Sequence, residues 1–185
     1  MPLLVQLILS KNAISDIQFL DSLPLEILYL NHNAIISFDV QLPCLKTLNL
    51  SHNLINNTNN IDFLPQLTYL NLQSNKLSTV KDLDHFPLLQ HIILSKNRIV
   101  AISSIHHDTL STFDVSHNKL KNIPSYLSMV TIHFNNNHLN DLNSIVQAHY
   151  PYCTTFSLSN NAVYRFKHIQ DYMKRVCPLL IHKSC

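Results

Sequence analysis

The chain has 185 residues, a formal net charge of +2 and only 13% charged residues, so its composition predicts no strong positive field for polyanions. It contains no glycine, which excludes glycine-rich phosphate loops and the G-x-S-x-G turn of many hydrolases. No run of 18 or more apolar residues occurs, so the sequence predicts no membrane-spanning helix.

A motif of spaced leucines that ends in an asparagine repeats from Leu4 to about Val163. Each copy follows the pattern L-x-x-L-x-L-x-x-N, and an aliphatic residue stands two places later, as in Leu67-Leu70-Leu72-Asn75-Leu77. The last three copies replace some leucines by other apolar residues. The frame asparagines, one per copy, follow at intervals of 19 to 24 residues and are Asn12, Asn33, Asn53, Asn75, Asn97, Asn118, Asn137 and Asn161.

The repeat predicts an α/β solenoid of about eight coils. Alternating leucines turn to one face of a short strand, so successive strands form a parallel sheet on the concave side. The asparagine amides can pair with turn backbone groups and form an internal column. The remainder of each copy, such as Ile17–Pro24, Ile61–Pro65 and Val80–Pro87, predicts a short helical or 3₁₀ segment on the outer side.

The C-terminal stretch has a different pattern. Apolar residues at helical spacing predict an amphipathic helix that covers the last coil, and they are Phe166, Ile169, Met173 and Val176. The segment Cys177–Ile181 then supplies a final strand-like edge. We therefore predict one domain, with the solenoid at residues 1–163 and its helical cap at residues 164–185.

The N-terminal coil begins at Leu4, and only three residues precede it. A leucine coil without a cap leaves an exposed strand edge, which favours pairing with another chain. Fraying of this coil, its coverage by a partner or a second copy, and a longer parent protein all remain open.

These copies resemble the leucine-rich repeat, and in particular its 22-residue class, typified by the protein phosphatase 1 regulatory subunit. The resemblance implies a horseshoe of stacked coils and a role in binding rather than catalysis. It also implies phosphatase regulators, axonemal dynein light chains and a spliceosomal subunit as functional relatives. Tyr164-Arg165 and Pro178-Leu179-Leu180 are similar to the C-terminal cap of that class, although their separation is longer.

The strand residues between the leucines should point to the concave face. In the first five coils, several of them are aliphatic or aromatic where polar residues would cost nothing, which indicates a surface for a protein partner. The competing interpretation is that such residues only satisfy β-propensity. The predicted partner-binding residues are Ile8, Ile27, Tyr29, Asn49, Tyr69, Asn71, His91, Ile93, Asp114 and His133.

A basic edge is predicted beside the asparagines. Lys76, Arg98 and Lys119 each follow a frame asparagine in successive coils, and Lys96 precedes one. An acidic protein or RNA could bind there, although a solvated rim explains the same residues and nucleic acid is the less expected partner.

The spacing of the cysteines and histidines indicates no metal site or catalytic site. No metal-ligand spacing is present, and His32, His52 and His117 occupy a solvated repeat position, so the sequence predicts no metal, no cofactor and no enzyme. The four cysteines are not clustered at the N-terminus: Cys44 and Cys153 fit repeat positions for small apolar residues, and Cys177 and Cys185 follow. This usage favours a reducing, cytoplasmic compartment.

The predicted function is therefore a non-enzymatic scaffold or regulatory subunit that binds a folded protein through its concave face. Two alternatives remain. The possible glycosylation sequence Asn56-Asn57-Thr58, in an asparagine-rich loop, favours an extracellular recognition module, whereas the one at Asn49 lies in a predicted strand. The basic edge favours a ribonucleoprotein subunit.

Overall fold

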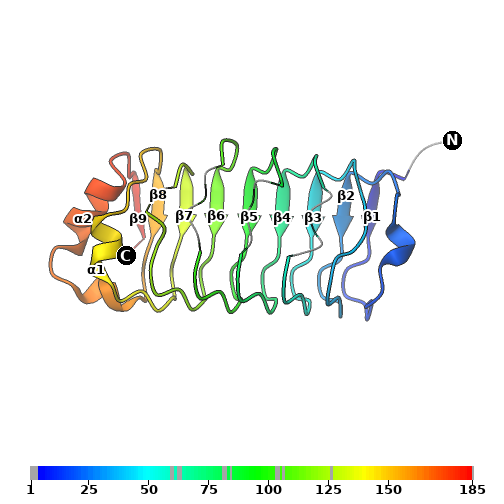
Figure 1. The fold of residues 1–185 in the computed structure, drawn as a ribbon, viewed down its shortest axis with the longest axis horizontal. Coiled ribbons are helices and arrows are strands. Elements are labelled where there is room, and N and C mark those ends of the chain that lie inside the picture. The colour runs from blue at the N-terminus through cyan, green and yellow to red at the C-terminus, as the bar shows by residue number, and fades with distance from the viewer. Residues whose placement is uncertain are drawn as a thin grey trace.

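In the described part of the chain, nine short parallel strands lie side by side, in chain order from β1 to β9 (Figure 1). This computed structural model describes residues 4–58, 61, 64–80, 83, 85–102, 105, 107–125 and 127–184. The strands are β1 (Gln6–Ile8), β2 (Ile27–Tyr29), β3 (Thr47–Asn49), β4 (Tyr69–Asn71), β5 (His91–Ile93), β6 (Thr112–Asp114), β7 (Thr131–His133), β8 (Thr155–Ser157) and β9 (His182–Ser184). The predicted leucine-rich repeat solenoid is confirmed, and eight of the strands come from the repeats.

One continuous core lies behind the sheet. The middle residue of each strand points inward, so Leu28, Leu48 and Leu70 are paired in register and are fully buried. The strand residues on either side of them are partly exposed, except Asn71, which is buried. A single coil cannot bury these side chains alone, because each fully buried leucine contributes about 1.5–3 kcal/mol only when a neighbouring coil covers it.

The frame asparagines form a column inside the coils. The Asn53 side chain shows the pattern: its Nδ2 donates to the carbonyls of Leu30 and Leu50 at 3.0 Å each, and its Oδ1 accepts from the Ile35 N–H at 3.0 Å. Because Leu30 and Ile35 belong to the preceding coil, this amide joins two coils. The other frame asparagines do the same, except Asn12 in the first coil, whose amide donates only within its own turn. The six asparagines from Asn53 onward are at most 8% exposed. No buried polar side-chain atom in the described residues lacks a hydrogen-bond partner.

The residue before each frame asparagine adopts a left-handed backbone conformation, with φ between 53° and 59°. These residues are Lys11, His32, His52, Ser74, Lys96, His117, Asn136 and Asn160. Non-glycine residues pay roughly 1–2 kcal/mol for this conformation. The turn is nevertheless held in place, because the same N–H reaches the next coil, as when the Lys96 N–H donates to Ser116 O at 3.0 Å.

Among the described residues, the helical outer segments lie mainly at the two ends of the solenoid. A 3₁₀ helix, η1, spans Gln18–Leu20, the helix α1 spans Leu142–Val146, and a second 3₁₀ helix, η2, spans Ala162–Arg165. Between β2 and β7, the described outer residues form turns, bends and irregular backbone rather than helices. Residues 62, 63, 81, 82 and 84, which belong to two of the predicted helical segments, lie outside the described residues. Prolines such as Pro43, Pro65 and Pro87 stand in these segments, and proline does not continue a helix.

The C-terminal cap contains the predicted helix with two differences. Helix α2 (Ile169–Val176) buries Ile169, Met173 and Val176 and packs against α1 (Figure 1). Phe166 is 42% exposed, so its assignment to the buried face of the helix was wrong. It lies at the end of η2, before α2 begins.

The final strand also differs from the prediction. The sequence predicted a strand at Cys177–Ile181, but the chain turns at Pro178, so pairing with β8 begins only near Ile181. The Ile181 N–H donates to Thr154 O at 3.0 Å, and β9 follows at His182–Ser184. The sheet therefore continues beneath the cap.

The N-terminal edge is open in the part of the chain that the structure describes. Strand β1 pairs with β2 on one side, and Leu4, Val5 and Ile8 are 52%, 44% and 59% exposed. Leu7 and Leu9 are only partly buried. None of the helices found among the described residues has the length and apolar character to cross a membrane.

Candidate functional site

The strands bring all ten predicted partner-binding residues to one surface, which we call the sheet face. Parallel pairing in register places Ile27, Thr47, Tyr69 and His91 in one line across β2 to β5. A second line runs across β1 to β7 and contains Ile8, Tyr29, Asn49, Asn71, Ile93, Asp114 and His133. Most of these side chains are partly exposed.

Two aromatic side chains of the sheet face support each other. The rings of Tyr69 and His91 lie with centroids 6.3 Å apart at an interplanar angle of 50°. His91 Nδ1 lies 3.0 Å from Thr112 Oγ1, which fixes the imidazole against β6. A rigid aromatic side chain loses little conformational entropy on binding, so this pair is suited to anchor a partner.

Three polar residues of the sheet face bind their own backbone. The side-chain oxygens of Asn49, Asn71 and Asp114 accept hydrogen bonds from the backbone N–H two residues later, at 3.0, 2.9 and 2.9 Å. Such Asx turns end the strand. These side chains therefore have a local structural role in addition to any contact with a partner. The sequence analysis missed this role, although Asn or Asp at the end of a strand could have indicated it.

The C-terminal part of the sheet face uses its polar groups internally. His133 Nδ1 lies 2.7 Å from Ser157 Oγ, and Asn135 Nδ2 donates to the same oxygen at 2.7 Å. Asn135 Oδ1 accepts from the N–H and the hydroxyl of Ser159, both at 2.9 Å. The coils from β1 to β5 thus offer more apolar and aromatic surface than those from β6 to β8.

Charge on the sheet face is nearly balanced. Lys46 Nζ lies 2.8 Å from Glu26 Oε2, just before β3 and β2, and the two charges neutralise each other. Among the strand residues from β1 to β8, Asp114 carries the one acidic side chain, and no lysine or arginine is present. Binding here would depend on buried area and hydrogen bonds more than on attraction between charges.

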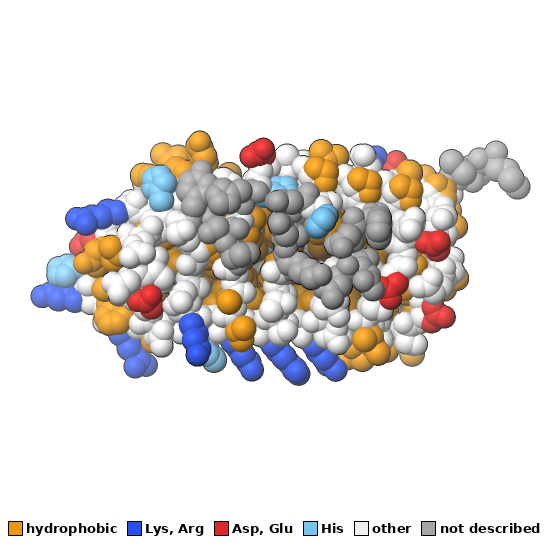
Figure 2. Space-filling model, in the orientation of Figure 1, with side chains coloured by type: hydrophobic (Ala, Val, Ile, Leu, Met, Phe, Trp, Pro, Cys, Tyr) orange, Lys and Arg blue, Asp and Glu red, His pale blue; other side chains and the backbone are white. Residues whose placement is uncertain are grey.

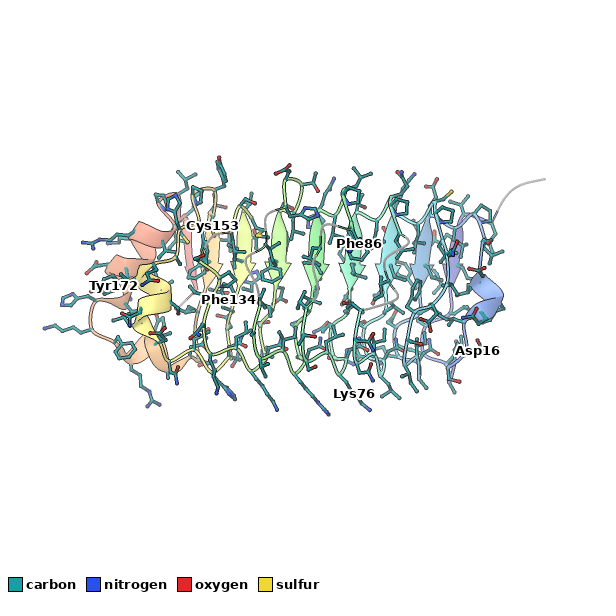
Figure 3. The ribbon with its side chains drawn as sticks, viewed as in Figure 1. Asp16, Lys76, Phe86, Phe134, Cys153 and Tyr172 are labelled. Atoms are coloured by element: carbon teal, nitrogen blue, oxygen red, sulfur yellow. The ribbon has the colours of Figure 1, made fainter. Side chains whose placement is uncertain are left out.

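The predicted basic residues lie on a different surface, at the turns that follow the strands. Lys76, Lys96, Arg98 and Lys119 are exposed. Figure 2 shows a row of Lys and Arg side chains along one long edge of the molecule, and Figure 3 labels Lys76 there. The structure thus separates the basic edge from the sheet face.

Two buried thiols meet beneath the cap. Cys153 and Cys177 are fully buried, and a hydrogen bond between the thiols lowers the pKa of Cys153 and raises that of Cys177, which burial raises further. Burial also raises the pKa of Tyr150, whose hydroxyl donates to Pro124 O at 2.7 Å. The cluster packs the last coil against α2, with Cys153 on the β8 side (Figure 3).

The other cysteines differ from these two. Cys44 was predicted at a repeat position for small apolar residues, but it is exposed and stands just before the buried Leu45. Cys185 lies outside the described residues.

The histidine column contains one close pair. The rings of His32 and His52 stack with centroids 4.1 Å apart at 9°. Partial burial lowers the pKa of His52, and the charges of His32 and Lys96 lower it further. The described residues contain no group of three or more His, Cys, Asp or Glu side chains arranged to hold a metal ion.

Comparison with known proteins identifies the fold by structure rather than by sequence. No protein-family model matches the chain, and no curated protein matches it. The leucine-rich repeat domain of a Shigella effector superposes with a TM-score of 0.69 at 23% identity, covering 92% of this chain and 74% of that one. YopM from Yersinia enterocolitica gives 0.58 at 23% identity, covering 86% of this chain and 38% of that one.

The functional domain of InlJ from Listeria monocytogenes gives a TM-score of 0.56 at 21% identity, covering 93% of this chain and 47% of that one. The chain therefore spans less than half of the YopM and InlJ chains. Identities this low demonstrate a common fold and nothing finer. Together with the parallel sheet and the asparagine column, these similarities show that the chain has the leucine-rich repeat fold.

Proposed function

We propose that the chain is a non-enzymatic protein-interaction module, a scaffold or regulatory subunit, that binds a folded protein through the sheet face between β1 and β5. The single observation that carries the proposal is the grouping of Ile27, Tyr29, Tyr69, His91 and Ile93 on one rigid, nearly neutral surface. Soluble proteins rarely group aromatic and aliphatic side chains on an exposed face without a binding role.

The cytoplasm is the proposed compartment. The three described cysteines are free thiols, as expected under reducing conditions. Asn56, within a possible glycosylation sequence, is exposed and supports the extracellular alternative. A glycan on Asn56 in the natural protein would decide for that alternative. The repeat interval of 19 to 24 residues supports the 22-residue class.

Replacing two anchors tests the proposal. The double variant Tyr29→Ser, Tyr69→Ser should lower partner capture from a lysate at least tenfold, because each partly exposed tyrosine anchor should contribute on the order of 2 kcal/mol to binding. Quantitative mass spectrometry measures the captured protein, and the melting temperature should change little because both rings are partly exposed.

Tyr152→Ser is the matched control, since Tyr152 is 58% exposed but lies outside the sheet face. Capture by this variant should equal that by the unmodified protein. Because the sheet face is nearly neutral, capture should also change little between low and physiological salt. Undiminished capture by the double variant, in a folded protein, would overturn the proposal.

A further inference from the structure

The basic edge contains a regular line of cations that the proposed function does not use. We call Lys76, Arg98 and Lys119 the cation row. Their backbone N–H groups donate to the carbonyls of Ile55, Leu77 and Ile99, at 2.8, 2.8 and 2.9 Å. Each of these carbonyls lies two residues after the frame asparagine of the preceding coil, so the three backbones stand in the same position of successive coils. Strands β4, β5 and β6 pair in register, which sets the spacing of the row at about 4.8 Å.

Charges of the cation row have no acidic partner within the described residues. The ion pairs found there join Lys46 to Glu26 and Asp171 to His168 and Lys174. All three cations are exposed, and Lys96 adds a fourth positive charge in the same turn as Arg98. In Figure 2, no coloured acidic side chain stands between the blue side chains of this edge. An anion with a matching repeat would relieve the repulsion among these like charges.

The spacing of the cation row matches the face of an α-helix. Acidic residues three or four positions apart lie on one helix face, and successive turns rise by about 5.4 Å. This rise is close to the coil spacing of about 4.8 Å, and flexible lysine and arginine side chains take up the difference.

The turns around the cation row also lack the platforms that single-stranded nucleic acids use. Residues 73–77, 95–99 and 116–120 contain no phenylalanine, tyrosine or tryptophan. Proteins that bind single strands without sequence preference combine positive charge with such stacking rings. The net charge of only +2 provides no wider positive field.

We propose that the cation row is a second binding site, separate from the sheet face, for the acidic face of a helix in a protein partner. Contact would place one carboxylate near each cation, in three successive coils. Because the site is exposed and charged, its affinity should fall steeply with salt. Binding at the nearly neutral sheet face should not, so the two sites can be told apart in solution.

Three labelled probes test this proposal by fluorescence anisotropy at low salt. The first is a helical peptide with four glutamates on one face, the second has the same composition with the glutamates distributed around the helix, and the third is single-stranded polyadenylate of equal total charge. The unmodified protein should bind the first peptide at least fivefold more tightly than either other probe. Equal binding of the two peptides, or tighter binding of the RNA, would overturn the proposal.

The triple variant Lys76→Glu, Arg98→Glu, Lys119→Glu should lose at least tenfold affinity for the first peptide. The control carries Lys11→Glu, Arg165→Glu and Lys167→Glu, which change the net charge equally at exposed positions outside these coils. It should lose less than threefold. An equal loss in both variants would show that net charge alone binds the peptide, against the proposal. The Tyr29→Ser, Tyr69→Ser variant should bind the peptide with unchanged affinity. A failure of the sheet-face proposal can therefore be told apart from a failure of the cation-row proposal.

Discussion

Asn97→Ala is expected to lower the free energy of unfolding by about 2–4 kcal/mol, on the scale of a lost buried hydrogen-bond network. Asn97 is 8% exposed, its Nδ2 donates to Leu72 O and Leu94 O at 2.9 Å each, and its Oδ1 accepts from the Leu77 N–H at 3.0 Å. Both carbonyls keep a second amide donor, but the Leu77 N–H loses its partner inside the protein. Urea denaturation followed by circular dichroism measures the change.

The chain supplies a matched control for this substitution. Asn12 is exposed, belongs to the first coil, and donates only to carbonyls of its own turn, Leu9 O and Ser10 O, at 3.1 Å each. Asn12→Ala should therefore cost less than about 1 kcal/mol. If the two variants lose equal stability, the asparagines do not join the coils as the hydrogen bonds indicate.

Phe134→Ala is expected to cost about 3–5 kcal/mol, the usual loss for a large buried aromatic side chain. Phe134 is fully buried near the C-terminal end (Figure 3), and its ring meets Phe113 and Phe156 edge-on, with centroids 6.3 and 6.0 Å away. Such pairs add about 0.5–1.5 kcal/mol beyond buried area. The midpoint of urea denaturation should fall accordingly.

Loss of Phe134 should also uncouple the last coils from the others. In a solenoid each coil contacts only its neighbours, so a weakened junction allows the C-terminal end to unfold first. The transition should broaden and its denaturant slope should decrease. Phe19→Ala is the control, because Phe19 is 60% exposed and should cost less than about 1 kcal/mol. A sharp transition for Phe134→Ala, at the midpoint of the control, would contradict this account.

The leucine pattern predicted the sheet well because it reports directly on burial. Leu28, Leu48 and Leu70 alternate with less buried positions, and a strand is the element that places alternate residues on one face. The spacing of the asparagines then aligns successive strands in register. The sequence pattern predicted the ends of the chain less accurately. Phe166 continues the helical spacing of apolar residues, but α2 begins only at Ile169.

The left-handed turns could not be predicted from residue preference. Glycine favours this conformation, yet the chain contains none, and lysine, histidine, serine and asparagine occupy the positions instead. The surrounding hydrogen bonds impose the conformation, and those partners lie in the next coil. The exposure of Cys44 was also not predictable from residue preference, since only the stacked coils show which turn residues point outward.

Placement on the sheet face was predictable, but the state of each side chain was not. Strand alternation places Tyr29, Tyr69 and His133 on one surface. Whether a polar side chain can still bind a partner depends on its hydrogen bonds to other coils. His133 Nδ1 already forms a hydrogen bond with Ser157 Oγ, 24 positions later in the chain. The repeat frame gives the register of the strands, but only the structure shows which polar side chains form hydrogen bonds between coils.

Photo-crosslinking from the sheet face tests the central claim most directly. Thr47 lies between Ile27 and Tyr69 in the same line of residues. A photoreactive amino acid at position 47 therefore leaves the two tyrosine anchors, Tyr29 and Tyr69, unchanged. The same group at Ile36, which is 55% exposed in an outer segment, is the comparison. We expect partner adducts from position 47 and none from position 36. Adducts from position 36 alone would show that the partner binds the outer side and would contradict the account.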